Sequence, residues 1–406
     1  MAGVHETAME GETDQRTIEH VQAIATQAKL DPTDLAPISQ CLYFAEELNP
    51  EEMALLQVED GMLEHIMEGS SLIVRGDKQE NAILCTNDRT FDMKKQQTSN
   101  TLLLLPECQT VADMKDADQS LYDRQVVGYV HSYYELRRMR PKLQKLHILL
   151  DDRAYKGAMY EADHDEDDED EPKLYTLADL KSRIQASEEE IMAELKKIKA
   201  CCINSYWRVL EYNYENQVLS HIVNLVEENS WNYKEIPLNE TLEVLQSLEP
   251  RIILEHCLNC HGEKFEKDDV IYYALDEDKV CRSFAELLLR PADKFNFSEF
   301  LQSWQMSVPE TMTTGLHQLQ GMALIDKTSR PEVIWYFPVS ALPEDEKDRF
   351  DTLFRTREKW TKDDIEPYIQ DLVTAKTSAG ALLTKHTRSS MGPNGVKLYN
   401  SKRPVR

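Results

Sequence analysis

The second half of this 406-residue sequence repeats one structural unit, and the repeat limits the folds that the chain can adopt. From about residue 175 the chain passes through a helix, a turn, a second helix and a β-rich segment, and it begins again roughly 60 residues later. Further helical patterns precede the last three copies, in "QVLSHIVNLVEEN", "KVCRSFAELLLR" and "DEKDRFDTLFRTREKW". Three helices followed by a β-hairpin form a winged helix. We therefore predict tandem winged-helix units, of which the first is truncated.

Local signals place some of these helices. Ser187 and Glu190 form a capping-box pattern that predicts the start of a helix in the first copy. In the third copy, Pro309 and Glu310 predict the start of a helix over "VPETMTTGLHQLQGMALI". The closing strands are predicted in "SYWRVLEY", "DVIYYALD", "PEVIWYFP" and "VKLYNS".

The second copy contains "ILEHCLNCHGEKF", in which Cys257 and Cys260 are separated by two residues. Such a pair occurs in zinc sites and thiol oxidoreductases, and C-x-x-C-H also attaches haem. A structural zinc takes about four ligands, and this sequence has no second closely spaced pair nearby. Ile253, Cys257 and Cys260 have the spacing of a buried helix stripe. We predict a helix with buried thiols; a zinc or redox site is the alternative.

The copies differ in local charge. This matters because a nucleic-acid-binding surface must be locally basic even in a chain of net charge -27. After Asp371 the sequence has no acidic residue but seven lysines and arginines, including Lys376. We predict phosphate contacts without base readout from six of them, the C-terminal cationic set: Lys385, Arg388, Lys397, Lys402, Arg403 and Arg406. The alternative is a solvated face on a scaffold whose units all bind protein.

The first half has short β-prone runs, "CLYF", "SLIVRG", "NAILCT", "RTFDMK" and "TLLLLP", separated by turn-forming pieces such as "TNDR" and "QQTSN". A small sheet of this kind has exposed edges that need cover. We expect partner chains to complete a β-barrel-like domain; alternatively "DRQVVGYVHSYY" closes the sheet internally. The residues expected to bind the partner are Leu72, Ile73, Val74, Ile83, Leu84, Phe91, Leu103 and Leu104.

Two charged segments lie between the halves. Nine of the eleven residues from Glu161 to Glu171 are acidic, which predicts a disordered linker or, alternatively, a mimic of a nucleic-acid backbone. Upstream, "ELRRMRPKLQKLHILL" predicts a helix that carries Arg137, Arg138, Arg140, Lys142 and Lys145. These cations could contact phosphates, pair with an acidic partner or face solvent.

Motifs of catalysis are missing from the sequence. It contains no G-x-x-x-x-G-K-[ST], G-x-G-x-x-G, G-x-S-x-G or H-E-x-x-H, so we expect neither an enzyme nor a bound cofactor or metal. The acidic N-terminus is unlike a signal peptide, and no run approaches the roughly 18 apolar residues of a membrane span. We therefore expect an intracellular protein without a membrane partner.

Several strings resemble the "defective in sister chromatid cohesion" family, from about residue 36 to the C-terminus. They include "SLIVRGDKQENAILCTNDRTFDM", "TSNTLLLLP", "YYELRRMRPKLQKL", "REKWTKDDIEPYIQDL" and "GVKLYNSKRP". The resemblance implies an accessory subunit of the alternative replication factor C clamp loader. The resemblance implies a nuclear protein with a shared β-barrel and three DNA-binding winged helices, whereas we count three full units and a truncated one.

The resemblance also implies partners. These are the large and small chromosome transmission fidelity subunits, DNA polymerase epsilon and DNA, with the small replication factor C subunits and the sliding clamp as indirect partners. ATP hydrolysis would belong to the other subunits.

The expected fold class is α+β. The expected domains are a terminal segment (1–35), a β-rich partner-binding domain (36–125), a basic helical connector (126–158), an acidic linker (159–173) and winged-helix units at 174–214, 215–277, 278–340 and 341–406.

Overall fold

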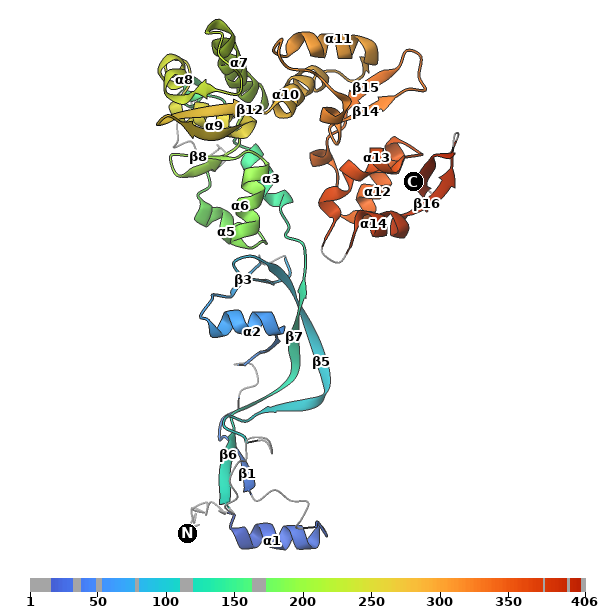
Figure 1. Ribbon diagram of the computed structural model, residues 1–406. Helices are drawn as coiled ribbons and strands as arrows, with labels where there is room; N and C mark the ends of the chain where they lie inside the picture. Colours follow the sequence, from blue (N-terminus) through green and yellow to red (C-terminus); the bar gives the residue numbers. More distant parts are fainter. Residues whose placement is uncertain are drawn as a thin grey trace, which may run out of the picture. The chain divides into compact units, whose positions relative to one another are not determined.

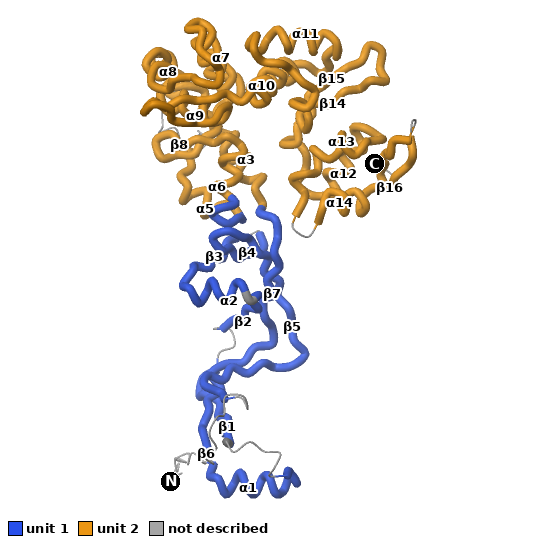
Figure 2. Tube along the Cα trace, viewed as in Figure 1, with its two compact units in different colours: residues 1–141, 185–190 blue, residues 142–184, 191–406 orange. Residues whose placement is uncertain are grey.

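The computed structural model describes residues 16–31, 38–48, 53–76, 80–109, 120–162, 173–374, 377–392 and 395–402. The chain divides into two compact units, which Figure 2 colours separately: Met1–Pro141 with Gln185–Glu190, and Lys142–Ile184 with Ile191–Arg406. Helices and mainly antiparallel sheets give the α+β class that the sequence predicts. Most of the predicted acidic linker, residues 163–172, lies outside the described residues.

The first unit consists mainly of strands. Its elements are α1 (Ile18–Gln27), β1 (Ile38–Phe44), β2 (Leu55–Gln57), α2 (Asp60–Met67), β3 (Ile73–Arg75), β4 (Ile83–Cys85), β5 (Thr90–Leu104), β6 (Ser120–Val126) and β7 (Gly128–Arg138). Five strands form a sheet in the order β2-β7-β5-β4-β3, and β1 pairs with β6 in a separate parallel ribbon. Among the described residues β2 and β3 each have one strand neighbour, so this sheet has two open edges.

The long strands β5 and β7 run antiparallel, and both bend along their length (Figure 1). Their register pairs Phe91 with Arg138 and Leu104 with Gly128, and it shifts between Gln97 and Leu102. The turn predicted in "QQTSN" is therefore wrong, since this polar stretch is an irregular part of one continuous strand. Strand β7 provides the backbone partner that overrides the local turn preference.

The helix predicted over Arg137 to Lys145 is also wrong. Strand β7 ends at Arg138, where Arg137 pairs with Asp92 across the sheet, and the next helix begins only at Gln144. Pro141 lies between them, and proline disfavours helical backbone in the residue that precedes it. The basic residues of this segment are thus divided between a strand, a connection and the start of a helix.

The second unit contains four successive groups of helices, each followed by a hairpin, except that residues 188–190 of the first group are assigned to the first unit. The first group has α3 (Gln144–Asp151), α4 (Ala158–Ala162), α5 (Leu177–Arg183), α6 (Glu188–Lys197), β8 (Cys201–Ile203) and β9 (Tyr206–Arg208). The second has α7 (Tyr212–Glu228), β10 (Ile236–Pro237), α8 (Leu238–Leu245), α9 (Arg251–His261), β11 (Gly262–Lys267) and β12 (Val270–Leu275). The third has α10 (Glu277–Leu289), β13 (Phe295–Asn296), α11 (Phe297–Ser307), η3 (Leu316–Leu319), β14 (Ala323–Asp326) and β15 (Val333–Tyr336). The fourth has η4 (Val339–Ala341), α12 (Glu346–Thr356), α13 (Lys362–Ile365), η5 (Glu366–Tyr368), η6 (Gln370–Leu372), α14 (Ala379–His386), β16 (Thr387–Met391) and β17 (Lys397–Ser401).

One detail recurs in all four groups: a short extended segment ahead of the second helix, or ahead of α5 in the first group, pairs with the last strand of the hairpin. The pairs are Tyr175 with Trp207, Ile236 with Tyr273, Phe295 with Ile334, and Trp360 with Tyr399. In three groups the next residue caps the following helix with its side chain, namely Thr176, Asn296 and Thr361. The repeat therefore extends to strand pairing and helix starts.

Helix starts were predicted with mixed success. The capping box is confirmed, because the Glu190 backbone N–H donates to Ser187 Oγ at 3.3 Å and the Ser187 N–H donates to Glu190 Oε2 at 3.0 Å. The helix predicted at Pro309 and Glu310 is wrong, because this stretch is loop up to the short 3-10 helix η3. The buried Gln318 holds the loop by accepting from the backbone N–H of residue 315 at 2.9 Å.

Apolar cores among the described residues stabilise the second unit, and two of them contain a buried tryptophan. The larger one runs from Tyr155 to Ile334 and includes Trp304, whose indole N–H donates to the Cys281 carbonyl at 2.7 Å. The smaller one lies mostly in the last group, with Leu324 of β14 added from the third, and contains the fully buried Trp360. In the described ranges no helix combines the length and apolar character needed to cross a bilayer.

Candidate functional site

The last group of elements presents the candidate nucleic-acid interface. Ser378 starts α14 by accepting from the Ala381 N–H at 3.2 Å, and β16 and β17 follow as a hairpin. Gly395, in the connection between these strands, has a φ of 73°, a conformation that glycine adopts without strain. Of the C-terminal cationic set, Arg403 and Arg406 lie outside the described residues, as does Lys376.

Two members of this set, Lys385 and Lys402, already have partners within the last group. Lys385 lies on α14, and its ammonium contacts Glu346 Oε2 at 2.6 Å. His386 Nε2 lies 3.2 Å from the same oxygen. The hydrogen bond from Lys385 lowers the pKa of Glu346 despite its partial burial, so this carboxylate stays charged and offsets nearby positive charge.

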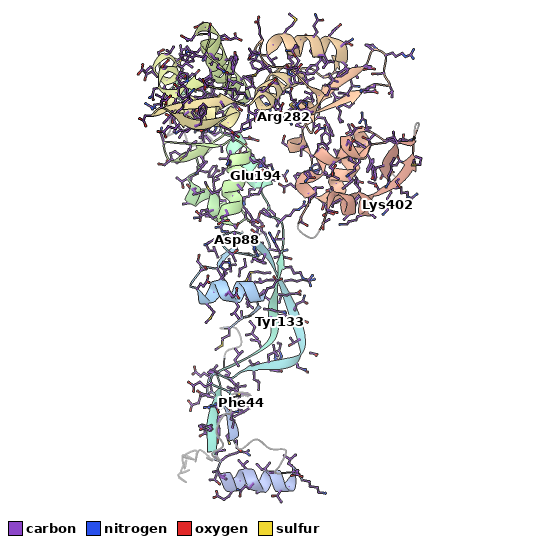
Figure 3. All side chains as sticks on the ribbon, in the orientation of Figure 1. Phe44, Asp88, Tyr133, Glu194, Arg282 and Lys402 are labelled. Atoms are coloured by element: carbon purple, nitrogen blue, oxygen red, sulfur yellow. The ribbon has the colours of Figure 1, made fainter. Side chains whose placement is uncertain are left out.

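Lys402 has a different partner. Its ammonium donates to the backbone carbonyls of Thr384 and Lys385, at 3.1 Å for the latter. Lys402, labelled in Figure 3, therefore covers carbonyls at the C-terminal end of α14, where a cation is favourable. A phosphate that binds Lys402 would have to compete with these carbonyls for its ammonium group.

Arg388 and Lys397 are exposed, and no ion pair joins either to another described residue. The register places Arg388 opposite Asn400 and Lys397 opposite Met391. Because side chains alternate along a strand, the two cations project from opposite faces of the hairpin. The sequence located the basic module, but the structure divides its cations between two hairpin faces and one helix end.

The predicted partner-binding residues are also divided. Ile83, Leu84 and Phe91 are buried within the first unit, where Leu84 and Phe91 pack with Met62 and Leu136. Leu72 and Leu104 are half-buried. Ile73, Val74 and Leu103 are exposed, at 42%, 58% and 39% of their surface, and they remain accessible to another chain.

Sequence reasoning missed two exposed apolar residues on β1. Leu42 is 50% exposed and Phe44 61% exposed (Figure 3). The run "CLYF" was predicted as a strand, so alternation along it could have identified two side chains on one face. Its pairing with β6, which is distant in sequence, could not have been found from this run alone.

Cys257 and Cys260 both lie on helix α9, where they have a structural role. Cys257 is 1% exposed, and burial raises the pKa of its thiol well above the usual value and that of Cys260 to about 11. Both thiols are therefore protonated at neutral pH, whereas metal binding and exchange chemistry need thiolates. No group of three or more potential metal ligands is assembled in the described part of the chain.

Polar neighbours fix this helix. His256 donates from Nε2 to the Lys199 carbonyl at 2.9 Å, and His261 Nε2 lies 3.2 Å from Glu215 Oε1. Burial lowers the pKa of His261 to about 3, so the imidazole is neutral. Lys199 binds the same Glu215 oxygen at 2.6 Å; burial opposes its charge, but Glu215 outweighs burial and raises the pKa of Lys199.

Comparison with known proteins identifies relatives along nearly the whole chain. The family model "Sister chromatid cohesion protein Dcc1" matches residues 53–369. The Danio rerio protein named sister chromatid cohesion protein DCC1 is 49% identical over 394 residues, which cover 96% of this chain and 99% of the relative. The Homo sapiens protein of that name is 46% identical over 396 residues, covering 96% of this chain and 100% of the relative. The Saccharomyces cerevisiae protein is 23% identical over 374 residues, covering 87% and 95%. The chain belongs to the Dcc1 family of sister chromatid cohesion proteins.

Proposed function

We propose that this chain is a non-catalytic nuclear subunit of an alternative clamp loader, and that it acts in sister chromatid cohesion during DNA replication. Membership of the Dcc1 family over residues 53–369 is the observation that carries this proposal. In it, the chain helps to load the sliding clamp and links the loader to the leading-strand polymerase epsilon. ATP hydrolysis is left to the small replication factor C subunits and their large partner.

The four groups of the second unit are proposed to be winged helices, with full units at 215–277, 278–340 and 341–406 after a shorter one at 174–214. The recurring order of helix, extended segment, two helices and hairpin supports this assignment. The third group departs from it, since the short 3-10 helix η3 stands where its third helix would be.

The last winged helix is proposed to bind DNA through the hairpin β16–β17. Arg388 and Lys397 on its two faces would contact phosphates on either side of an inserted wing. A scaffold that binds only protein is the second candidate, and it is favoured by the internal partners of Lys385 and Lys402.

The first unit is proposed to join the large and small chromosome transmission fidelity subunits through its open sheet. The edge strand β3 and the exposed Ile73 and Val74 support this role. A partner strand added at this edge would complete a shared barrel.

Fluorescence anisotropy of the full-length chain with a labelled DNA duplex tests the DNA-binding part. We expect an affinity that falls steeply with salt, by about one unit of logarithmic slope for each phosphate contact. An affinity that is negligible at low salt, or independent of salt, would favour the protein-binding scaffold. Co-purification of the tagged chain with clamp-loader subunits tests the assembly part independently of DNA.

A further inference from the structure

A pocket of about 600 Å³ lies in the second unit, away from the C-terminal cationic set. Helices α6, α9 and α10 and strand β9 supply its lining, which draws on three of the four groups. Its charged lining residues are one glutamate and five cations: Glu286, Lys196, Lys197, Lys199, Lys279 and Arg282. In a chain of net charge -27, this is a local excess of positive charge.

The five cations differ in how far they are already neutralised. Lys197 pairs with Glu194 at 3.0 Å and Lys199 pairs with Glu215 at 2.6 Å. Lys196 and Lys279 are exposed, and the described residues offer neither of them a carboxylate within ion-pair distance. Two lysine charges on different helices therefore face the pocket without a counter-charge.

Arg282 adds a third cation on the α10 wall (Figure 3). Its Nη1 donates to the Gln318 and Gln320 carbonyls, at 2.6 and 2.8 Å, and these two bonds orient the guanidinium. The lining carboxylate Glu286 is held by the Tyr336 hydroxyl at 2.7 Å. The arginine is thus pre-oriented, while Glu286 keeps its negative charge in the pocket lining and interacts with Arg282.

The remaining walls are ordered before any ligand arrives. Trp207 is fixed in β9 by pairing with both Cys202 and Tyr175. Asn259 accepts from the Tyr273 hydroxyl at 2.8 Å through Oδ1.

We propose that this pocket binds the phosphate of a phosphorylated serine or threonine side chain on a partner polypeptide, with Lys196, Lys279 and Arg282 as its cationic contacts. A phosphoserine has a charge of about -1.5 to -2 at neutral pH and three acceptor oxygens, which matches three cations from two helices. The volume suits a side chain and a few neighbouring atoms rather than a duplex. Because the lining joins three groups, the bound side chain would also tie these groups together.

The test is a titration of the full-length chain with a short glycine-alanine peptide that contains one phosphoserine, followed by the broadening of its ³¹P resonance. The variant Lys196→Gln with Lys279→Gln removes both unpaired charges but keeps side chains of similar length. The matched control is Lys264→Gln with Lys359→Gln, two exposed lysines of the same unit outside the pocket. Thermal melting confirms that all variants fold.

We expect saturable broadening with the wild type and the control, and binding that is about tenfold or more weaker in the pocket variant. Equal broadening in all three proteins, or none in the wild type, would overturn the proposal. Deoxyadenosine monophosphate binding more tightly than the peptide, with the same loss in the pocket variant, would overturn the peptide assignment. So would tighter binding of a short oligothymidylate at these lysines.

Discussion

A buried arginine in the last group shows how one residue can decide the stability of the candidate DNA-binding module. Arg349 is 2% exposed, and its guanidinium donates to Asp371 Oδ1 at 2.9 Å and Oδ2 at 3.0 Å. It also donates to the carbonyls of Tyr368 and Pro343. Among the described residues, Asp371 is the only carboxylate that forms an ion pair with Arg349. We therefore expect Asp371→Asn to lower the free energy of unfolding by about 2–3 kcal/mol.

Chemical denaturation of the full-length chain measures this loss. The control is Asp363→Asn, which changes an exposed carboxylate on α13 of the same group. A loss no greater than that of the control would mean that the carbonyl partners alone satisfy the guanidinium. Sequence reasoning used Asp371 only as the last acidic residue before the basic tail; nothing in the sequence links it to Arg349, which lies 22 positions upstream.

At the scale of elements, cations on the hairpin β16–β17 and on helix α14 differ in their partners, so we expect their substitutions to have different effects. Arg388 has no carboxylate to neutralise it in the described chain, whereas Lys385 is paired with Glu346. Arg388→Glu should therefore weaken duplex binding more than Lys385→Glu, by about three- to tenfold, and should lower the salt slope by about one. Lys385→Glu should instead lower the melting temperature, because it brings two carboxylates together.

Anisotropy and thermal melting of both variants, beside Lys264→Glu as an exposed control on β11, distinguish these effects. If the two C-terminal variants lose affinity equally, the pairing with Glu346 does not limit the availability of Lys385. If neither loses affinity while the wild type binds, DNA is bound elsewhere on the chain.

The elements that the sequence predicted well are those with local signals. Helices α7, α10 and α12 have long apolar periodicity, and Thr176, Asn296 and Thr361 each follow an aromatic residue at a helix start. The wrong elements depended on distant partners. Strand β5 continues through "QQTSN" because β7 pairs with residues on both sides of the register shift, namely Gln97 and Leu102. The loop before η3 is held by the buried Gln318 and its bond to Asp278. Neither partner can be identified from local propensity.

At the scale of the whole molecule, the sequence reveals the contiguous set of cations but not the cationic pocket, whose residues are dispersed along the chain. The C-terminal cationic set is a run of charge visible without coordinates. The cationic pocket combines Lys196 with Lys279 and Arg282, more than 80 positions further along, and it exists only because helices of successive groups pack in one unit. Local charge in the sequence around these residues is mixed, so it gave no signal for the pocket.

In the proposed assembly, partner chains add to the open edges of the sheet in the first unit. Ile73 and Val74 lie on the edge strand β3, whose register with β4 is Ile73 to Cys85 and Val74 to Leu84. Both side chains are exposed, so replacing them by lysine, Ile73→Lys with Val74→Lys, should leave the melting temperature of the isolated chain within a few degrees of wild type. Charged side chains at an edge hinder the addition of another strand, so co-purification of the fidelity subunits should be lost.

The control Val244→Lys with Leu248→Lys changes two exposed apolar residues in the second unit and should keep these partners. Retention of the partners by the β3 variant at wild-type yield would place strand sharing at another edge.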